Sequence, residues 1–277
     1  MNELGSISIG AVIGLVLGAL GGGGAILAVP ALVYVLGAQV HAAVAASLAI
    51  VLVGAASGLV AYARDRQVAW RVALSLAAFG AVGAWAGAQL GMRVPGERLL
   101  LLLGVLMLGA AASMLRRPTL SARPVPRNPV AVAAAGLTLG LVTGFFGVGG
   151  GFLTVPVLLS VFGLAMRRAV GTSLAVISAN SLGGLIGYLA SETLDWHLLL
   201  LVSAGSLGGA VGGYWVARVL PERQLRRAFA GLVVLIAIYL MEKNLGAGWS
   251  AHAALDSPSG ARAVPTALSS TSLNFLL

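Results

Sequence analysis

Long apolar runs are the feature that most restricts what this chain can fold into. Runs of roughly 18 to 25 residues recur from near the N-terminus to about Leu240, and a helix of that length crosses the hydrocarbon layer of a bilayer, which is about 30 Å thick. Only 9% of the 277 residues are charged, compared with about 25% in soluble domains. The period-two alternation that an outer-membrane barrel requires is not seen in the sequence. The sequence therefore predicts an all-α polytopic membrane protein, because helices satisfy their backbone polar groups internally in lipid.

Charge and composition exclude several classes of function. The net charge is +9, but the arginines lie between the apolar runs, where the positive-inside rule places them, so we expect no nucleic-acid partner. The chain has no cysteine, which excludes disulfides and thiolate metal sites. The sequence shows neither a metal-ligand cluster nor Ser-His-Asp spacing, so we expect no metal, no cofactor and no enzymatic activity. Met1-Asn2-Glu3 carries an acid in place of a basic n-region, which indicates a retained membrane segment rather than a signal peptide.

The two halves of the chain resemble each other at an offset of 126 residues, with no gap between Gly14 and Pro95. Shared Ala, Leu and Gly composition does not easily produce so long a register, and we infer a tandem duplication. The matches include Gly21, Gly23, Gly24 and Pro30 with Gly147, Gly149, Gly150 and Pro156, the Ser-Leu-Ala elements that begin at Ser47 and Ser173, Trp70 with Trp196, and Pro95 with Pro221.

Each half contains about five apolar segments. They lie at about 6–20, 25–37, 40–63, 72–91 and 98–115, and at about 130–146, 150–164, 169–189, 197–217 and 226–241. The first two segments of each half are short, and they fit either two thin spans or a re-entrant hairpin of half-helices. The predicted organisation is a first membrane repeat over 1–115, a cytoplasmic Arg- and Pro-rich linker over 116–129, a second membrane repeat over 130–245 and a disordered tail over 246–277.

Charged loops orient the two halves. The loop after the third segment holds Arg64, Arg66 and Arg71 in the first half, whereas its partner holds Glu192 and Asp195 and no arginine. Because basic loops face the cytoplasm, equivalent loops are predicted to lie on opposite sides of the membrane. The linker is also basic, and every assignment then alternates consistently. The sequence thus predicts two inverted-topology repeats with the N-terminus outside, as in many secondary transporters.

Glycine clusters followed by a proline interrupt equivalent segments of the two halves. Such interruptions at matching positions are the best sequence pointer to the midplane site of a transporter. A broken helix frees backbone N–H and C=O groups, and the N-terminus of the helix that follows favours an anion. We expect the glycines to bind substrate through their N–H groups and the prolines to fix the segments that follow. The predicted substrate-binding residues are Gly21, Gly22, Gly23, Gly24 and Pro30 in the first half and Gly147, Gly149, Gly150, Gly151 and Pro156 in the second.

Hydroxyl and amide side chains of the third segment are further candidates for the substrate site. Ser47, Thr172, Ser173 and Asn180 are predicted to add hydrogen bonds to the substrate, and the same segments also hold Ser57, Ser178 and Ser181. Two alternatives remain open: glycines also let helices pack closely, and a Ser or Thr also bonds back to its own helix. An amide in mid-span, such as that of Asn180, needs a partner in either case.

Other positions have simpler interpretations. The pairs Gly14/Gly18, Gly83/Gly87, Gly140/Gly144 and Gly209/Gly213 have the small-xxx-small spacing of helix packing. His41 begins the third segment, with Arg167 in the equivalent place, and we interpret His41 as an interfacial residue. All eight acids lie in loops or tails, so the buried carboxylate relay of many proton-driven transporters is not predicted. The sequence leaves the coupling ion open between a proton and sodium, and it assigns no oligomeric state.

The chain resembles the TauE/SafE family of membrane transporters, the sulfite exporter or toluenesulfonate uptake permease family. The residues that carry the resemblance are GALGGGGAILAVP from Gly18 to Pro30 and GFFGVGGGFLTVP from Gly144 to Pro156, each followed by a small-residue segment with a Ser-Leu-Ala element. The likeness covers roughly residues 6 to 241. It implies transport of sulfite, a sulfonate or another organosulfur or organic anion across the bacterial inner membrane.

We therefore expect an inner-membrane permease that moves a small anionic substrate by alternating access between two inverted repeats. Two alternatives are kept: a passive anion channel of the same fold, and a membrane scaffold subunit that transports nothing. Saturable flux would indicate the carrier, high ohmic conductance the channel, and dependence on a partner chain the scaffold.

Overall fold

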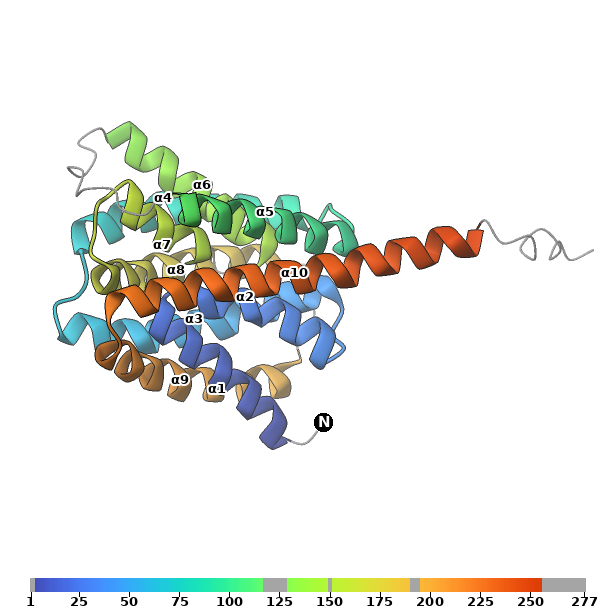
Figure 1. Ribbon diagram of the computed structural model, residues 1–277, viewed down its shortest axis with the longest axis horizontal. Helices are drawn as coiled ribbons and strands as arrows, with labels where there is room; N and C mark the ends of the chain where they lie inside the picture. Colours follow the sequence, from blue (N-terminus) through green and yellow to red (C-terminus); the bar gives the residue numbers. More distant parts are fainter. Residues whose placement is uncertain (1–2, 117–128, 149–150, 190–194, 256–277) are drawn as a thin grey trace, which may run out of the picture.

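The computed structural model describes residues 3–116, 129–148, 151–189 and 195–255, and the side chains within 3–109, 130–148, 151–189 and 195–243. In this described part the chain forms ten α-helices and one short π-helix, with no strand. They are α1 Glu3–Leu20, α2 Gly23–Pro30, the π-helix Ala31–Val35, α3 Val40–Arg64, α4 Trp70–Gly91, α5 Gly96–Arg116, α6 Pro129–Phe146, α7 Gly151–Ser160, α8 Met166–Leu189, α9 Trp196–Val219 and α10 Glu222–Leu255 (Figure 1). α10 continues past the expected boundary at 245.

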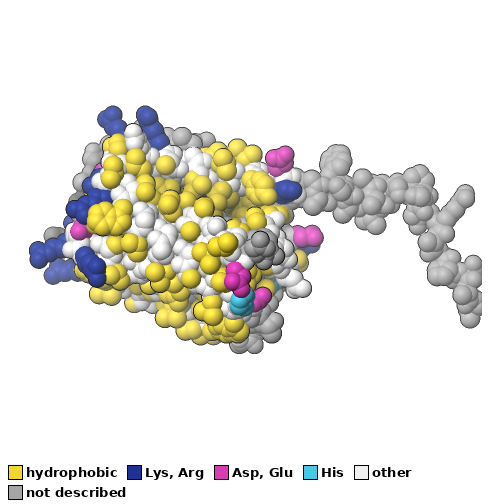
Figure 2. All heavy atoms as spheres, turned by 90° about the horizontal axis from the view of Figure 1, so that it is seen from below, with side chains coloured by type: hydrophobic (Ala, Val, Ile, Leu, Met, Phe, Trp, Pro, Cys, Tyr) yellow, Lys and Arg dark blue, Asp and Glu magenta, His cyan; other side chains and the backbone are white. Residues whose placement is uncertain are grey.

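Six of the described helices are long and apolar enough to span a membrane: α1, α3, α4, α8, α9 and the part of α10 up to Lys243. Their outward faces remain apolar, with exposed side chains such as Leu74, Val82, Leu200 and Leu235. Figure 2 shows this apolar belt between two polar ends, with Lys and Arg gathered at one end. An apolar belt of this kind is stable only against lipid. The prediction of an all-α, multi-pass membrane protein is confirmed.

Helices of one half pack mainly on helices of the other. α1 lies along α9, and α4 lies along α6, while α3 and α8 pack together in the middle of the bundle and α5 lies against α10 (Figure 1). Shifting the chain by 126 residues exchanges α1 with α6 and α4 with α9, so the pair α1–α9 corresponds to the pair α4–α6. The arrangement yields two groups of mixed origin. Group A is α1, α2, α3 and α9, and group B is α4, α6, α7 and α8.

Small residues set the distance between the paired helices. A Cβ added to Gly14 or Gly18 of α1 would overlap the backbone of α9, and one added to Gly209 or Gly213 of α9 would overlap the backbone of α1. The glycines of α4 and α6 meet each other's backbones in the same way. Backbones that approach this closely gain dispersion contacts over their whole length. The helix-packing interpretation of the four small-xxx-small pairs is confirmed.

The equivalent helices α3 and α8 run in opposite directions. The end of α3 and the beginning of α8 meet at one end of the bundle, where the Ala69 backbone nitrogen, in the turn between α3 and α4, donates a hydrogen bond of 3.0 Å to Thr172 Oγ1 on α8. At the other end, His197 at the start of α9 lies 3.6 Å from Glu3 of α1. This geometry agrees with opposite orientation of the two halves, and the inverted repeat itself stays a prediction. The end of the bundle with the α3–α4 turn is called the basic end below.

Candidate functional site

The first helix break is a tight turn inside the bundle. α1 ends at Leu20, Gly21 takes a φ of +70°, and α2 begins at Gly23. An L side chain is strained at this φ, which explains the glycine. α2 folds back along α1, since a Cβ on Gly24 would overlap the backbone at Ile13. Gly18 packs against Ala210, whereas α9 continues to Val219, so the turn lies within the bundle and not at its end.

The second break repeats the first in its described part. α6 ends at Phe146, Gly147 takes a φ of +67°, and α7 begins at Gly151. Gly149 and Gly150, both predicted to bind substrate, lie outside the described residues. The turns that follow α7 and the π-helix also contain glycines of positive φ, Gly163 and Gly37. Among the described residues, the four glycines with a positive φ therefore fall into two pairs with the offset of the sequence repeat, and each occupies a turn that requires it.

The two breaks touch each other in the centre of the molecule. A Cβ added to Gly22 would overlap the carbonyl group of Gly151, and a Cβ on Gly151 would lie 3.1 Å from the backbone nitrogen of Gly22 and overlap its Cα. Both glycines are buried. The structure thus brings predicted site residues of both halves into backbone contact across groups A and B. This contact leaves no room for a substrate between the two glycines.

Two of the predicted hydroxyl groups, those of Ser47 and Ser173, connect the central helices α3 and α8 to the helix breaks. Ser47 Oγ of α3 lies within hydrogen-bond distance of the carbonyl oxygens of Val44 and Gly147, and it has one proton to donate. Ser173 Oγ of α8 donates to Val170 and would lie 2.5 Å from a Cβ on Gly21. Ser47 and Ser173 therefore contact the break of the opposite half. Each hydroxyl has a protein partner in this conformation.

Thr172 lies next to Ser173 but contacts a different part of the chain. Its Oγ1 donates to the Arg168 carbonyl at 2.6 Å and accepts the Ala69 backbone N–H at 3.0 Å. It therefore holds the start of α4 against α8, which is a structural use of the group. Its role in substrate binding stays a prediction.

The two prolines lie inside the short helices and not at the turns. Pro30 is the last residue of α2, directly before the π-helix, and Pro156 lies in the middle of α7. A proline has no N–H to donate, so each removes one helical hydrogen bond. A π-helix, Ala31–Val35, directly follows Pro30. The expectation that Pro30 and Pro156 fix the segments that follow stays a prediction.

Asn180 and Ser181 differ from the other polar residues of α8. Both are fully buried, and among the described residues neither the amide atoms of Asn180 nor Ser181 Oγ has a hydrogen-bond partner. Polar groups buried in this way are rare in folded proteins, because each loses its bonds to water and gains none. Asn180 is the mid-span amide for which the sequence indicates the need of a partner.

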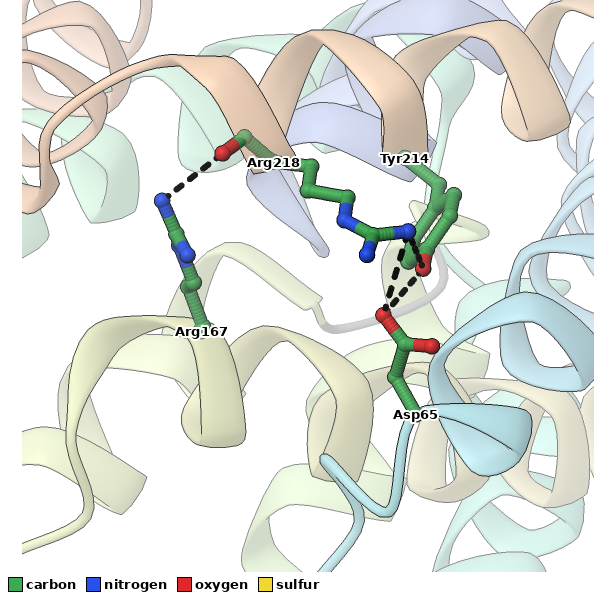
Figure 3. Close-up of polar contacts among 4 residues, drawn as sticks. All are labelled: Asp65, Arg167, Tyr214 and Arg218. Carbon is green, nitrogen blue, oxygen red and sulfur yellow. Dashed lines mark hydrogen bonds and ion pairs between the residues drawn. The ribbon is translucent and has the colours of Figure 1, made fainter.

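A polar network that the sequence did not predict closes the basic end (Figure 3). Asp65, just after α3, accepts a hydrogen bond from the Tyr214 hydroxyl and lies 3.8 Å from the Arg218 guanidinium, both on α9. Arg167 of α8 donates to the carbonyl oxygens of Arg218, at 2.9 Å, and Leu220, at 3.2 Å. The bonds of Arg167 join group B to group A. The charged residues are visible in the sequence, but no local signal pairs positions so far apart.

A related contact joins the two groups at the opposite end. His41 Nε2 of α3 lies 3.1 Å from the Val94 carbonyl oxygen in the turn after α4. His41 and Val94 are the equivalents of Arg167 and Leu220 at the offset of the repeat. Each end of the bundle therefore has one side chain that ties the start of a central helix to a carbonyl of the other group. His41 has this specific partner in addition to its expected interfacial position.

Tyr62 connects the basic end with the first break. Its hydroxyl donates a bond of 3.1 Å to the carbonyl oxygen of Gly18, near the end of α1. Its ring meets that of Tyr214 edge to face, with 5.1 Å between the centroids. The end of α1 is thus held by α3, and through Tyr214 it is linked to the network around Asp65.

The chain is similar to known membrane proteins over most of its length. The family model described as sulfite exporter TauE/SafE matches residues 6–240. A "Probable membrane transporter protein" of Xylella fastidiosa (strain Temecula1 / ATCC 700964) is 35% identical over 247 residues, which cover 86% of this chain and 95% of the relative. The "Probable membrane transporter protein YdhB" of Bacillus subtilis (strain 168) is 29% identical over 235 residues, or 80% of this chain and 96% of the relative. No solved structure matches the chain. Since the family model covers most of its length, the chain belongs to the sulfite exporter TauE/SafE family.

Proposed function

We propose that the protein is a secondary transporter of the bacterial inner membrane for a small anion: sulfite, a sulfonate or another organosulfur or organic anion. The observation that carries the proposal is the buried contact between Gly22 and Gly151. α7 begins at this contact and α2 begins one residue after it. The N–H groups of both first turns are the donors that an anion would meet if it separated the two breaks. The family's description as sulfite exporters favours a sulfur oxyanion as substrate.

Transport requires the two breaks to part and the substrate to be reachable from one side at a time. The backbone contacts of α1 with α9 and of α4 with α6 join the two sequence halves along whole helices. A rocking motion of one half against the other would disrupt these contacts, which are closely packed and costly to separate. We therefore assign the motion to groups A and B. They meet at α3 and α8, at the Gly22–Gly151 contact and at the carbonyl contacts of His41 and Arg167.

Flux measurements in proteoliposomes test the proposal. Radiolabelled sulfite, sulfoacetate, taurine and lactate are offered under a proton gradient, under a sodium gradient and under neither. We expect saturable flux of at least one of them, and the gradient that accelerates it identifies the coupling ion. The Gly151→Val variant should lose this flux, because its side chain would overlap Gly22.

Gly212→Ala is the matched control, because an added Cβ at this position of α9 meets nothing within 4 Å. It should transport like the native protein. Both variants are compared only after gel filtration shows that they are folded. High ohmic conductance without saturation would replace the transporter with a channel, and flux of none of these compounds would refute the proposal.

A further inference from the structure

The side chain of Asn180 fills the space beside Gly80, a glycine of the neighbouring helix α4. A Cβ added to Gly80 of α4 would overlap Asn180 Oδ1 and would lie 3.0 Å from Cγ and 3.2 Å from Nδ2. The amide therefore packs against α4 at Gly80, with Oδ1 nearest, and is fully buried. Neither Oδ1 nor Nδ2 has a hydrogen-bond partner among the described residues. The hydrogen-bonding groups of the amide are therefore buried and unused in this conformation.

The equivalent place in group A, between α3 and α9, is built differently. The positions that correspond to Asn180 and Gly80 are Gly54 and Ser206. Here the small residue is on the central helix, and the polar one comes from α9, where Ser206 Oγ donates to the Ile50 carbonyl oxygen at 3.4 Å. Ser206 is thus satisfied by the protein, whereas the Asn180 amide has no partner among the described residues. Helix packing alone does not require this difference, because both arrangements fill the same kind of gap.

Asn180 and Ser181 lie beside the helix break. Ile177 of α8 reaches the break, since its Cδ1 would be 2.5 Å from a Cβ on Gly151. Residues three and four positions further along a helix are the neighbours of such a residue on the same side. These two positions are Asn180 and Ser181, and Ser181 Oγ is also buried and without a partner among the described residues. Two unused polar side chains therefore flank the point where the proposed substrate path opens.

We propose that Asn180 and Ser181 recognise the substrate, donating hydrogen bonds from Nδ2 and Oγ to two oxygens of one oxyanion group. The inference rests on the proposed function and specifies its ligand. When groups A and B part, a change of rotamer carries the Asn180 amide from Gly80 toward the opened break. Neutral donors of this kind select anions that offer two acceptor oxygens, such as sulfite, sulfonates and carboxylates. A monatomic anion such as chloride has no second oxygen with which to span two separated donors and should bind more weakly than an oxyanion.

The test combines thermal unfolding in detergent with flux in proteoliposomes. Asn180→Leu keeps the branched shape of the side chain and removes its polar atoms, and Ser181→Ala removes the hydroxyl. Ser178→Ala is the matched control, because Ser178 lies on the same helix and its Oγ donates back to the Leu174 carbonyl oxygen at 2.8 Å. The probes are sulfite, sulfoacetate, taurine, lactate and chloride, each added to the native protein and to every variant.

Without any anion, Asn180→Leu should raise the melting temperature by about 2–4 °C, because an unpartnered amide is no longer buried. The stabilisation that an oxyanion gives the native protein should disappear in this variant, and the KM for flux should rise at least tenfold. Ser181→Ala should reduce the stabilisation by the oxyanion, and Ser178→Ala should leave it unchanged. Chloride should not stabilise the native protein.

Three results would overturn the proposal. Asn180→Leu could lower the melting temperature and leave the oxyanion effect intact, which would assign the amide to a buried structural water. Chloride could stabilise the native protein as strongly as the oxyanions, or no oxyanion could stabilise it at all. By contrast, oxyanion stabilisation that is lost in Asn180→Leu but occurs without any flux would support the binding site and refute transport.

Discussion

The packing of α1 on α9 predicts that alanine has different effects on stability at two adjacent residues, Gly212 and Gly213. An alanine Cβ at 213 would overlap the Leu15 carbonyl oxygen and would lie 2.7 Å from the Ala19 backbone nitrogen, whereas ordinary van der Waals contact begins at 3.4 Å. Because both partners are backbone atoms, the two helices must separate or bend. Overpacking of this kind costs about 1–3 kcal/mol, which corresponds to a fall in melting temperature of about 2–12 °C for a protein of this size. At Gly212 an added Cβ meets nothing within 4 Å.

Thermal unfolding of the purified protein in one detergent checks this difference. Gly213→Ala should unfold at a lower temperature than the native protein, and Gly212→Ala at the same temperature or a higher one, because alanine favours the helix. Gly87→Ala, whose Cβ would overlap the Leu141 carbonyl oxygen in the α4–α6 pair, should behave like Gly213→Ala. Equal melting temperatures for the Gly212 and Gly213 variants would refute the backbone contact between α1 and α9, and with it the assignment of the moving groups.

The remaining predictions use the absence of cysteine from the chain, which lets a single introduced thiol report without background. With a thiol at buried Ala25, Arg167→Ala should speed labelling by a membrane-impermeant maleimide from the basic end, because two bonds to carbonyls of group A are lost. His41→Ala should speed labelling from the opposite end, and equal effects from both sides would contradict the assigned contacts. Thiols placed at the exposed positions Arg66 and His197 should label from opposite sides of the membrane, and labelling from one side would refute the inverted repeat.

Much of the fold was predictable because its causes are local in sequence. A bilayer fixes the length of an apolar helix, and a turn that needs a positive φ selects glycine, so the apolar runs and the glycine positions were sufficient to place the helices. Gly21 and Gly147 are good examples, because each follows directly on the last residue of a helix. The turns at Gly37 and Gly163, which lie at the offset of the repeat, are also alike, since both glycines have a positive φ.

The candidate site was predictable only in part. The sequence indicated that the glycine clusters matter, but it gave no sign that Gly22 and Gly151 would be in direct backbone contact. It also predicted one common role for the hydroxyl and amide groups, whereas the structure gives Thr172 a bond to the start of α4 and leaves the Asn180 amide without a hydrogen-bond partner in the part of the chain that it describes. Whether a buried polar group is satisfied depends on the residues opposite it, and these lie on other helices.

The membrane-spanning character of the chain, the number of its apolar segments and the places where the helices break follow from the sequence, since each depends on apolar length or on the conformation of one residue. Which helices pair with each other becomes visible in the three-dimensional structure alone. To lipid, all apolar helices present similar surfaces, and the choice of α9 for α1 depends on glycines and small residues of both helices meeting in register. The same holds for Asp65 and Arg218, whose charges are obvious in the sequence and whose pairing exists only because the ends of α3 and α9 meet in space.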